Sequence, residues 1–146
     1  MENSQNNIFS ITSRVDFCDT DAAGLMHFST YFRFMEQAEA AFFRHLKIPL
    51  LSSDQSTSFG FPRIDVDCRF SQPLYFDDLV KIDLMVKEVT EHTLTYHFKF
   101  FQMPDEKRAA KGHLRVAFVE KTESSNLKKT SIPKDWLNQF RQWENA

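Results

Sequence analysis

Glycine, cysteine and long hydrophobic runs are all scarce in this chain of 146 residues, which has three glycines and two cysteines. The two thiols, Cys18 and Cys68, are too few for a zinc site or a dense disulfide framework. The longest apolar runs have only a few residues, so no membrane-spanning segment is expected. Neither sign of charge dominates: the chain has 18 Lys and Arg residues and 20 Asp and Glu residues, which gives a net charge of -2. Without a basic block, the sequence argues against a nucleic-acid-binding protein.

No secretory signal is expected either, since residues 1–10 contain neither a basic stretch nor an apolar one. We therefore expect a cytoplasmic protein with reduced thiols. The length fits one domain spanning residues 1–146. Hydrophobic residues make up 42% and charged residues 26%, close to a soluble globular average. Sixteen phenylalanines predict an aromatic core.

Apolar and polar residues alternate in five segments, which predicts five strands with one buried face and one wet face. These segments cover residues 9–17, 64–70, 80–86, 94–100 and 114–118. The last three follow one another with short breaks, which is typical of an antiparallel meander.

One segment, residues 28–46, has helical periodicity instead. Its apolar positions are Tyr31, Phe34, Met35, Ala38, Ala41, Phe42 and Leu46. Their i, i+3, i+4, i+7 spacing predicts a helix of about five turns. Ser29 is a candidate N-cap. A second, short helix is predicted to start at Pro133, a suitable first-turn proline.

The order of these elements predicts an α+β domain, with one long helix lying on a mainly antiparallel sheet. The helix is apolar enough to be wrapped by a curved sheet. The open edges of such a sheet favour pairing with another subunit.

Chemistry is expected just before the long helix, where Asp19, Asp21, Gly24 and His27 follow one another. A helix N-terminus offers unpaired N–H groups and partial positive charge, which can hold a developing oxyanion. A nearby carboxylate can act as nucleophile or general base on the polarised carbonyl. This combination suits acyl transfer or thioester hydrolysis. The spacing alone favours another role, in which the two aspartates only form the turn by bonding local amides.

Residues 15–36, VDFCDTDAAGLMHFSTYFRFME, resemble the N-terminal signature of the 4-hydroxybenzoyl-CoA thioesterase-like hot-dog proteins. The order of strands and helix matches this family over nearly the whole chain. The resemblance implies a hot-dog fold, a curved antiparallel sheet of about five strands around one long central helix. It also implies a homodimer or homotetramer with a site at the subunit interface.

The resemblance assigns roles to individual residues. Asp21 takes the position of the catalytic carboxylate, and the backbone amide at Phe28 takes the position that polarises the thioester carbonyl. Gly24 occupies the turn position, where positive φ or a close approach is needed. Tyr31 matches the tyrosine of the motif.

Two further residues belong to the predicted substrate-binding set. His27 precedes the usual position of a family His or Asn by one residue, and it is expected either to point into the site or to pack at the helix start. Glu36 matches an acidic family position and is expected either as a buried, paired carboxylate or as a helix-surface charge.

The sequence departs from the family prototype where a basic cluster should hold the CoA phosphates. The comparable stretch, residues 90–92, reads Thr-Glu-His. Lys87, Lys99, Arg108 and Lys111 are substitutes, although their interpretation as solvated surface charges is favoured.

We therefore expect an acyl-CoA thioesterase that releases CoA and a free acid, with an aromatic or a medium-length acyl group as the candidates. Neither a metal nor a cofactor is expected. An acyl-carrier-protein thioesterase and a non-catalytic acyl-binding oligomer stay open as alternatives. A hot-dog hydratase or dehydratase is disfavoured, because the sequence lacks its differently placed His-Asp pair.

Overall fold

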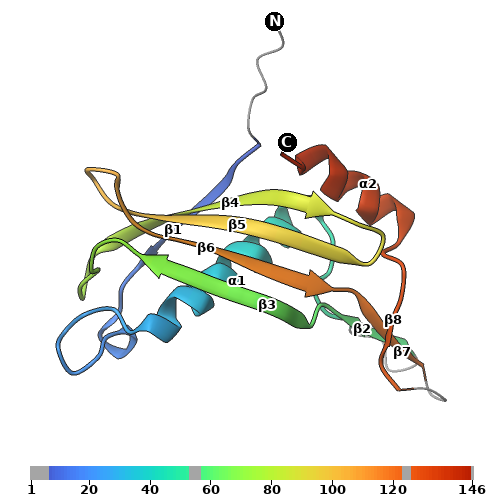
Figure 1. Ribbon diagram of the computed structural model, residues 1–146, viewed down its shortest axis with the longest axis horizontal. Helices are drawn as coiled ribbons and strands as arrows, with labels where there is room; N and C mark the ends of the chain where they lie inside the picture. The colour runs from blue at the N-terminus through green and yellow to red at the C-terminus, as the bar shows by residue number, and fades with distance from the viewer. Residues whose placement is uncertain (1–6, 53–56, 123–125, 146) are drawn as a thin grey trace, which may run out of the picture.

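The computed structural model describes residues 7–52, 57–122 and 126–145 and contains two sheets and two α-helices (Figure 1). The elements in chain order are β1 (Phe9–Arg14), a 3-10 turn (Phe17–Asp19), α1 (Phe28–Leu46), β2 (Thr57–Gly60), β3 (Arg63–Phe70), β4 (Leu79–Val89), β5 (Thr93–Gln102), β6 (Lys107–Ala117), β7 (Val119–Thr122), β8 (Lys128–Lys129) and α2 (Lys134–Trp143). The larger sheet has the order β1-β4-β5-β6-β3, and every neighbouring pair in it is antiparallel. The smaller sheet has the order β2-β7-β8. The predicted meander is confirmed as β4-β5-β6.

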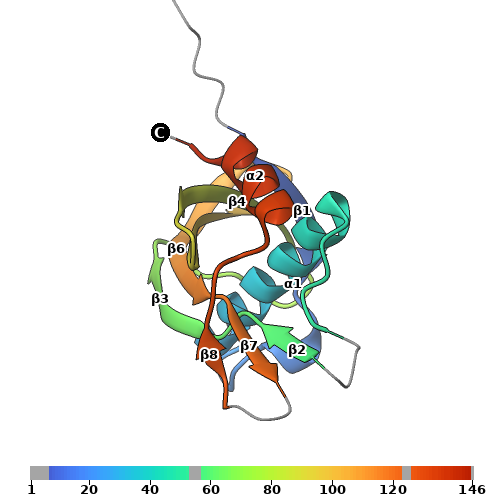
Figure 2. The same ribbon diagram turned by 90° about the vertical axis from the view of Figure 1, so that its right-hand side faces the viewer.

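The larger sheet curves around α1, as the end-on view shows (Figure 2). Helix α1 spans the residues expected from the periodicity, and its apolar face meets the concave face of the sheet. Its buried residues include Phe34, Phe42 and Phe43. The helix ends where Lys47 adopts a left-handed conformation, with φ of 59°, and returns its N–H to the last turn. The predicted hot-dog architecture is confirmed.

Alternation along the central strands separates the two faces of the sheet. On β5, Tyr96, Phe98 and Phe100 point inward and are buried, whereas His97 and Lys99 lie on the outer face and are partly exposed. This is the pattern expected of a strand with one side on the core and the other in water.

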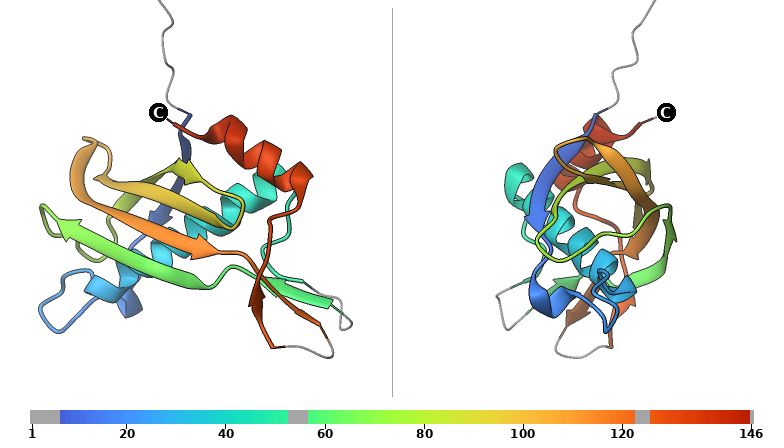
Figure 3. Two further views of the ribbon diagram at one scale, coloured as in Figure 1. Left: turned by 45° about the vertical axis from the view of Figure 1, so that its right-hand side comes forward. Right: turned by 90° about the vertical axis from the view of Figure 1, so that its left-hand side faces the viewer.

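Strand β3 is an edge strand, and here the expected burial was wrong. Ile64, Val66 and Phe70 are on its apolar face, yet they are 50%, 38% and 50% exposed. The helix lies beneath the middle of the sheet, and the views from both sides leave this edge uncovered (Figure 3). The strand therefore presents an unpaired backbone edge and an uncovered apolar face together.

Helix α2 closes the opposite end of the core. Its Trp143 ring lies 5.2 Å from Phe42, and its Phe140 ring lies 5.4 Å from Phe43. Just past the helix, Asn145 Oδ1 accepts a hydrogen bond from the Asn7 backbone N–H at 2.7 Å. The two ends of the described chain are thus joined side by side.

Candidate functional site

The loop between β1 and α1 is held in place by Asp19, which is 6% exposed. Its Oδ2 accepts the Asp16 backbone N–H at 2.9 Å, and its Oδ1 pairs with Arg33 Nη2 at 3.0 Å. Its carbonyl accepts hydrogen bonds from the Thr30 hydroxyl and the His27 backbone N–H. Asp19 therefore ties the loop to the first two turns of the helix.

Asp21 lies two residues further on, in an exposed tight turn. Its Oδ1 accepts the backbone N–H groups of Ala23 and Leu25 at 2.9 and 3.1 Å. Gly24 completes the turn with φ of 83°, a conformation that only glycine adopts without strain. Within the described residues, Asp21 Oδ2 has no hydrogen-bond partner, so one carboxylate oxygen is fixed and the other faces solvent.

The helix begins at Phe28, and its N-cap is His27 rather than the expected Ser29. His27 Nδ1 accepts the Ser29 backbone N–H at 3.2 Å and lies 2.8 Å from the Ser29 hydroxyl. The imidazole ring stacks on the exposed Phe28 ring at 4.5 Å. Of the expected roles for His27, the structure therefore shows the one at the helix start. The Phe28 N–H finds no acceptor in the described part of the chain.

A hollow of about 320 Å³ opens beside this helix end. It is lined by Leu25, Met26, Phe28, Tyr31, Phe70, Ser71, Gln72 and Pro73. Tyr31 is 3% exposed, with its ring 4.8 Å from Phe70 and 5.3 Å from Phe100. Burial raises the pKa of Tyr31 to about 12, so this hydroxyl stays protonated at physiological pH.

Glu36 lies two turns further along α1 and away from this hollow. It is exposed, and its Oε1 lies 3.9 Å from Arg63 Nη2. The buried, paired carboxylate is instead Glu39, whose Oε1 is 2.6 Å from the same guanidinium nitrogen. Burial raises the pKa of the Glu39 carboxyl, and the Arg63 charge opposes that rise. The hydroxyl of Tyr96 is buried next to this pair without a hydrogen bond of good geometry.

The expected site residues thus fall into two groups. Phe28 and Tyr31 line the hollow, and Asp21, Gly24 and His27 belong to the turn and cap that lead into it. Glu36 lies outside. An apolar hollow lined by the first residue of a helix, with an exposed carboxylate on the adjoining turn, can bind an acyl group and polarise its carbonyl.

Sequence reasoning missed Phe70 and Gln72, which enter the hollow from the end of β3. Phe70 continues the apolar alternation of that strand, and this was the available signal. Gln72 Nε2 donates a hydrogen bond to Gln102 Oε1 at 3.0 Å, and Gln102 Nε2 in turn donates one to Asp78 Oδ2 at 2.9 Å. These hydrogen bonds join residues that are 24 to 30 positions apart in the sequence, so a local sequence pattern cannot predict them.

In the described ranges, no three His, Cys, Asp or Glu side chains come together as a metal-binding group. Neither helix is both long enough and apolar enough to cross a membrane.

Comparisons with known proteins identify the family of the chain. A family model described as the thioesterase-like superfamily matches residues 15–140. The chain belongs to this superfamily.

Individual relatives extend the comparison. An Aquifex aeolicus (strain VF5) protein, provisionally described as an esterase, is 30% identical over 88% of this chain and 94% of its own. The acyl-CoA thioesterase YbgC of Haemophilus influenzae is 27% identical over 89% and 92% of the two chains. The solved structure of BH1999, a gentisyl-coenzyme A thioesterase, has a TM-score of 0.75 at 27% identity and covers 88% of this chain and 98% of that one.

Proposed function

We propose that this superfamily member hydrolyses acyl-CoA thioesters, with the Phe28 amide as the oxyanion donor and Asp21 as the catalytic carboxylate. The observation that carries the proposal is the unpaired backbone N–H of Phe28, a residue that lines the apolar hollow. The N-terminus of α1 carries partial positive charge, and a thioester oxygen placed there gains stabilisation as it becomes an oxyanion.

Asp21 has the arrangement that a reacting carboxylate needs. The two amide bonds to Oδ1 fix the side chain, and Oδ2 stays open to a ligand. As a nucleophile, Oδ2 would attack the carbonyl carbon and expel the CoA thiolate, leaving an anhydride for water to cleave. As a general base, it would take the proton of the attacking water instead.

An aromatic acyl group suits the hollow. The rings of Phe28, Tyr31 and Phe70 surround it, and aromatic rings gain from offset or edge-to-face contact with one another. The gentisyl-coenzyme A thioesterase named above acts on an aromatic acyl group, which supports the same class here.

We place this site at the interface of a homodimer. Phe70 both lines the hollow and lies on the uncovered face of β3. A second copy that covered this strand would close the hollow from the open side and exclude water from the reacting thioester.

The test compares Asp21→Asn with wild type in a thiol-release assay on aromatic and aliphatic acyl-CoAs. Asparagine keeps the Oδ1 acceptor of the turn and removes the charge. We expect kcat to fall by at least about 10²-fold, the scale for a positioned acid–base group. Substrate affinity should change far less.

Asp19→Asn is the matched control, because it removes a charge from the same loop. It should lower the melting temperature by weakening the contact with Arg33, while kcat measured on the folded protein changes much less. Equal losses of kcat in the two variants, or none in Asp21→Asn, would contradict the catalytic role of Asp21. Saturable acyl-CoA binding without turnover in wild type would favour a non-catalytic acyl-binding protein.

A further inference from the structure

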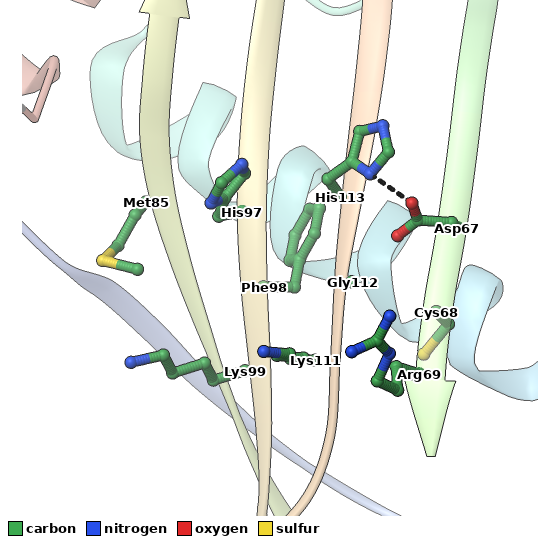
Figure 4. A pocket seen from close by; sticks show the side chains of 10 residues that line it. All are labelled: Asp67, Cys68, Arg69, Met85, His97, Phe98, Lys99, Lys111, Gly112 and His113. Carbon is green, nitrogen blue, oxygen red and sulfur yellow. Dashed lines mark ion pairs between the residues drawn. The ribbon is translucent and has the colours of Figure 1, made fainter.

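The outer face of the larger sheet carries a second hollow, of about 450 Å³, on the side away from α1 (Figure 4). It is lined by Asp67, Cys68, Arg69, Met85, His97, Phe98, Lys99, Lys111, Gly112 and His113. Three strands, β5, β6 and β3, supply its charged side chains. Nothing in the proposed hydrolysis uses this hollow.

Three cations form a row across these strands, which we call the cation row: Lys99, Lys111 and Arg69. Lys99 is directly opposite Lys111, and Lys111 is directly opposite Arg69. Like charges in directly opposite positions destabilise a sheet. The fold therefore keeps a repulsive arrangement at this place.

Of the neighbouring carboxylates, only Asp83 lies directly opposite a member of the row, Lys99 at its end. Asp83, opposite Lys99 on β4, accepts the Ser10 hydroxyl at 2.6 Å and lies 4.0 Å from Lys81. Asp67 is 2.8 Å from His113 Nδ1. Across the parts of the chain that the structure describes, no carboxylate lies within 4.0 Å of any charge in the cation row. The row is thus a patch of positive charge along the outer hollow, and none of its three cations is in an ion pair with a described residue.

The spacing indicates the kind of anion that fits. Neighbouring strands are about 4.8 Å apart, so three adjacent cations span roughly 10 Å. That span exceeds one phosphate and suits a ligand with several phosphates. Lysine acts as a point charge on such oxygens, and arginine adds a bidentate fork.

The cation row adjoins the hydrolytic site through β3. Arg69 lines the outer hollow, and the next residue, Phe70, lines the acyl hollow, because successive side chains of a strand point to opposite faces. A ligand held by the row would reach the acyl hollow by passing the end of β3 at residues 71–73.

We propose that the cation row binds the phosphate groups of the nucleotide half of coenzyme A. This inference rests on the proposed thioesterase function and selects its substrate class. A phosphopantetheine arm on a carrier protein has a single phosphodiester and no nucleotide, so it cannot engage all three cations. The row would thereby replace the basic cluster that residues 90–92 lack.

The first experiment measures binding of 3′-phosphoadenosine 5′-diphosphate by titration calorimetry, without any reaction. The Lys99→Ala, Lys111→Ala double variant should bind at least tenfold more weakly than wild type. Lys81→Ala is the matched control, because Lys81 lies on the same face but pairs with Glu106 at 3.1 Å, and its affinity should stay within twofold. Equal affinities in wild type and the double variant would overturn the proposal.

The second experiment uses turnover. The double variant should raise KM for the acyl-CoA severalfold with kcat unchanged, and should leave kcat/KM for the corresponding N-acetylcysteamine thioester unchanged, because that substrate has no phosphate. Parallel losses on both substrates would refute a phosphate site. Without turnover of any thioester the proposed function fails, and the calorimetric comparison still decides the phosphate site. A changed sedimentation coefficient with unchanged nucleotide affinity would make the row a subunit contact instead.

Discussion

At the scale of single residues, the buried pair of Glu39 and Arg63 is the most exacting electrostatic feature of the core. The Glu39 side chain is fully buried, and the Arg63 guanidinium contacts both of its carboxylate oxygens, at 2.6 and 3.3 Å. Removing one member of a buried pair leaves an uncompensated charge, which costs far more than the intact pair contributes.

We expect Arg63→Met to destabilise the fold by about 3 kcal/mol in urea unfolding at neutral pH. Without the guanidinium, burial holds the pKa of Glu39 above its unfolded value, so the folded state binds a proton that the unfolded state releases. Stability of the variant should therefore fall as pH rises from about 5 to 8, through the range above the unfolded carboxyl pKa.

A double variant isolates the cause. Adding Glu39→Gln to Arg63→Met should remove this extra pH dependence, because the buried group no longer titrates. Glu36→Ala, on the exposed carboxylate near the same guanidinium, should change stability by less than about 0.5 kcal/mol. If the free energy of unfolding of Arg63→Met changed with pH in the same way as that of wild type, the pairing of Arg63 with Glu39 would be refuted.

At the scale of elements, the contact between β6 and β3 depends on Gly112. A Cβ placed there would overlap the Asp67 backbone carbonyl and lie 2.6 Å from Met35 Cε. The strand pair and the central helix thus approach each other over a position that has no side chain.

Gly112→Ala should destabilise the protein by about 3 kcal/mol, because the clash is with backbone that cannot rotate away. Gly24→Ala should cost only about 1 kcal/mol, since its φ is positive but no atom lies within 4 Å of the added carbon. Urea unfolding of both variants checks the order. Equal losses would show that β6 can shift away from β3 without penalty.

Most elements with strong periodicity were predicted correctly, but the first strand ends at Arg14 rather than at residue 17, and Phe17 is exposed in a 3-10 turn rather than on the buried face. Elements without strong periodicity were missed. Helix α1 has the expected bounds, and α2 starts at Lys134, one residue after the expected start at Pro133, which is its N-cap. The first half of β6, from Lys107 to Gly112, lacks apolar alternation and was missed, as were the short strands β2, β7 and β8. These segments form strands because they pair with a neighbouring strand. The local sequence does not show which segment that neighbour is.

The same reason limits prediction of the site. The turn residues Asp21 and Gly24 could be recognised because glycine and aspartate have local conformational preferences. The partners of the buried carboxylates could not, because Asp19 meets Arg33 and Glu39 meets Arg63 only after folding. The alternation along β3 also could not show that no other described element of the chain packs over its apolar face.

At the scale of the whole molecule, this uncovered edge predicts assembly. Sedimentation velocity at micromolar concentration should give a dimer or a larger closed oligomer. Val66→Lys, in the middle of the exposed apolar face, should shift the protein toward monomer and lower activity at the same time. Phe17→Lys is the control, because Phe17 is 79% exposed and lies off this strand. A fully active wild-type monomer would contradict both the dimer and the interface site.

The hydrogen bonds between Asn7 and Asn145 have a consequence for single-molecule experiments. They join residues that are 138 positions apart in the sequence, so the two ends of the described chain are in contact in the folded state. An unfolded chain of this length has a radius of gyration of about 40 Å, against about 15 Å when folded. Fluorophores attached beside these two residues would transfer energy efficiently in the folded state and poorly after unfolding. Such a pair would report global unfolding, because both residues lie next to one another only in the folded chain.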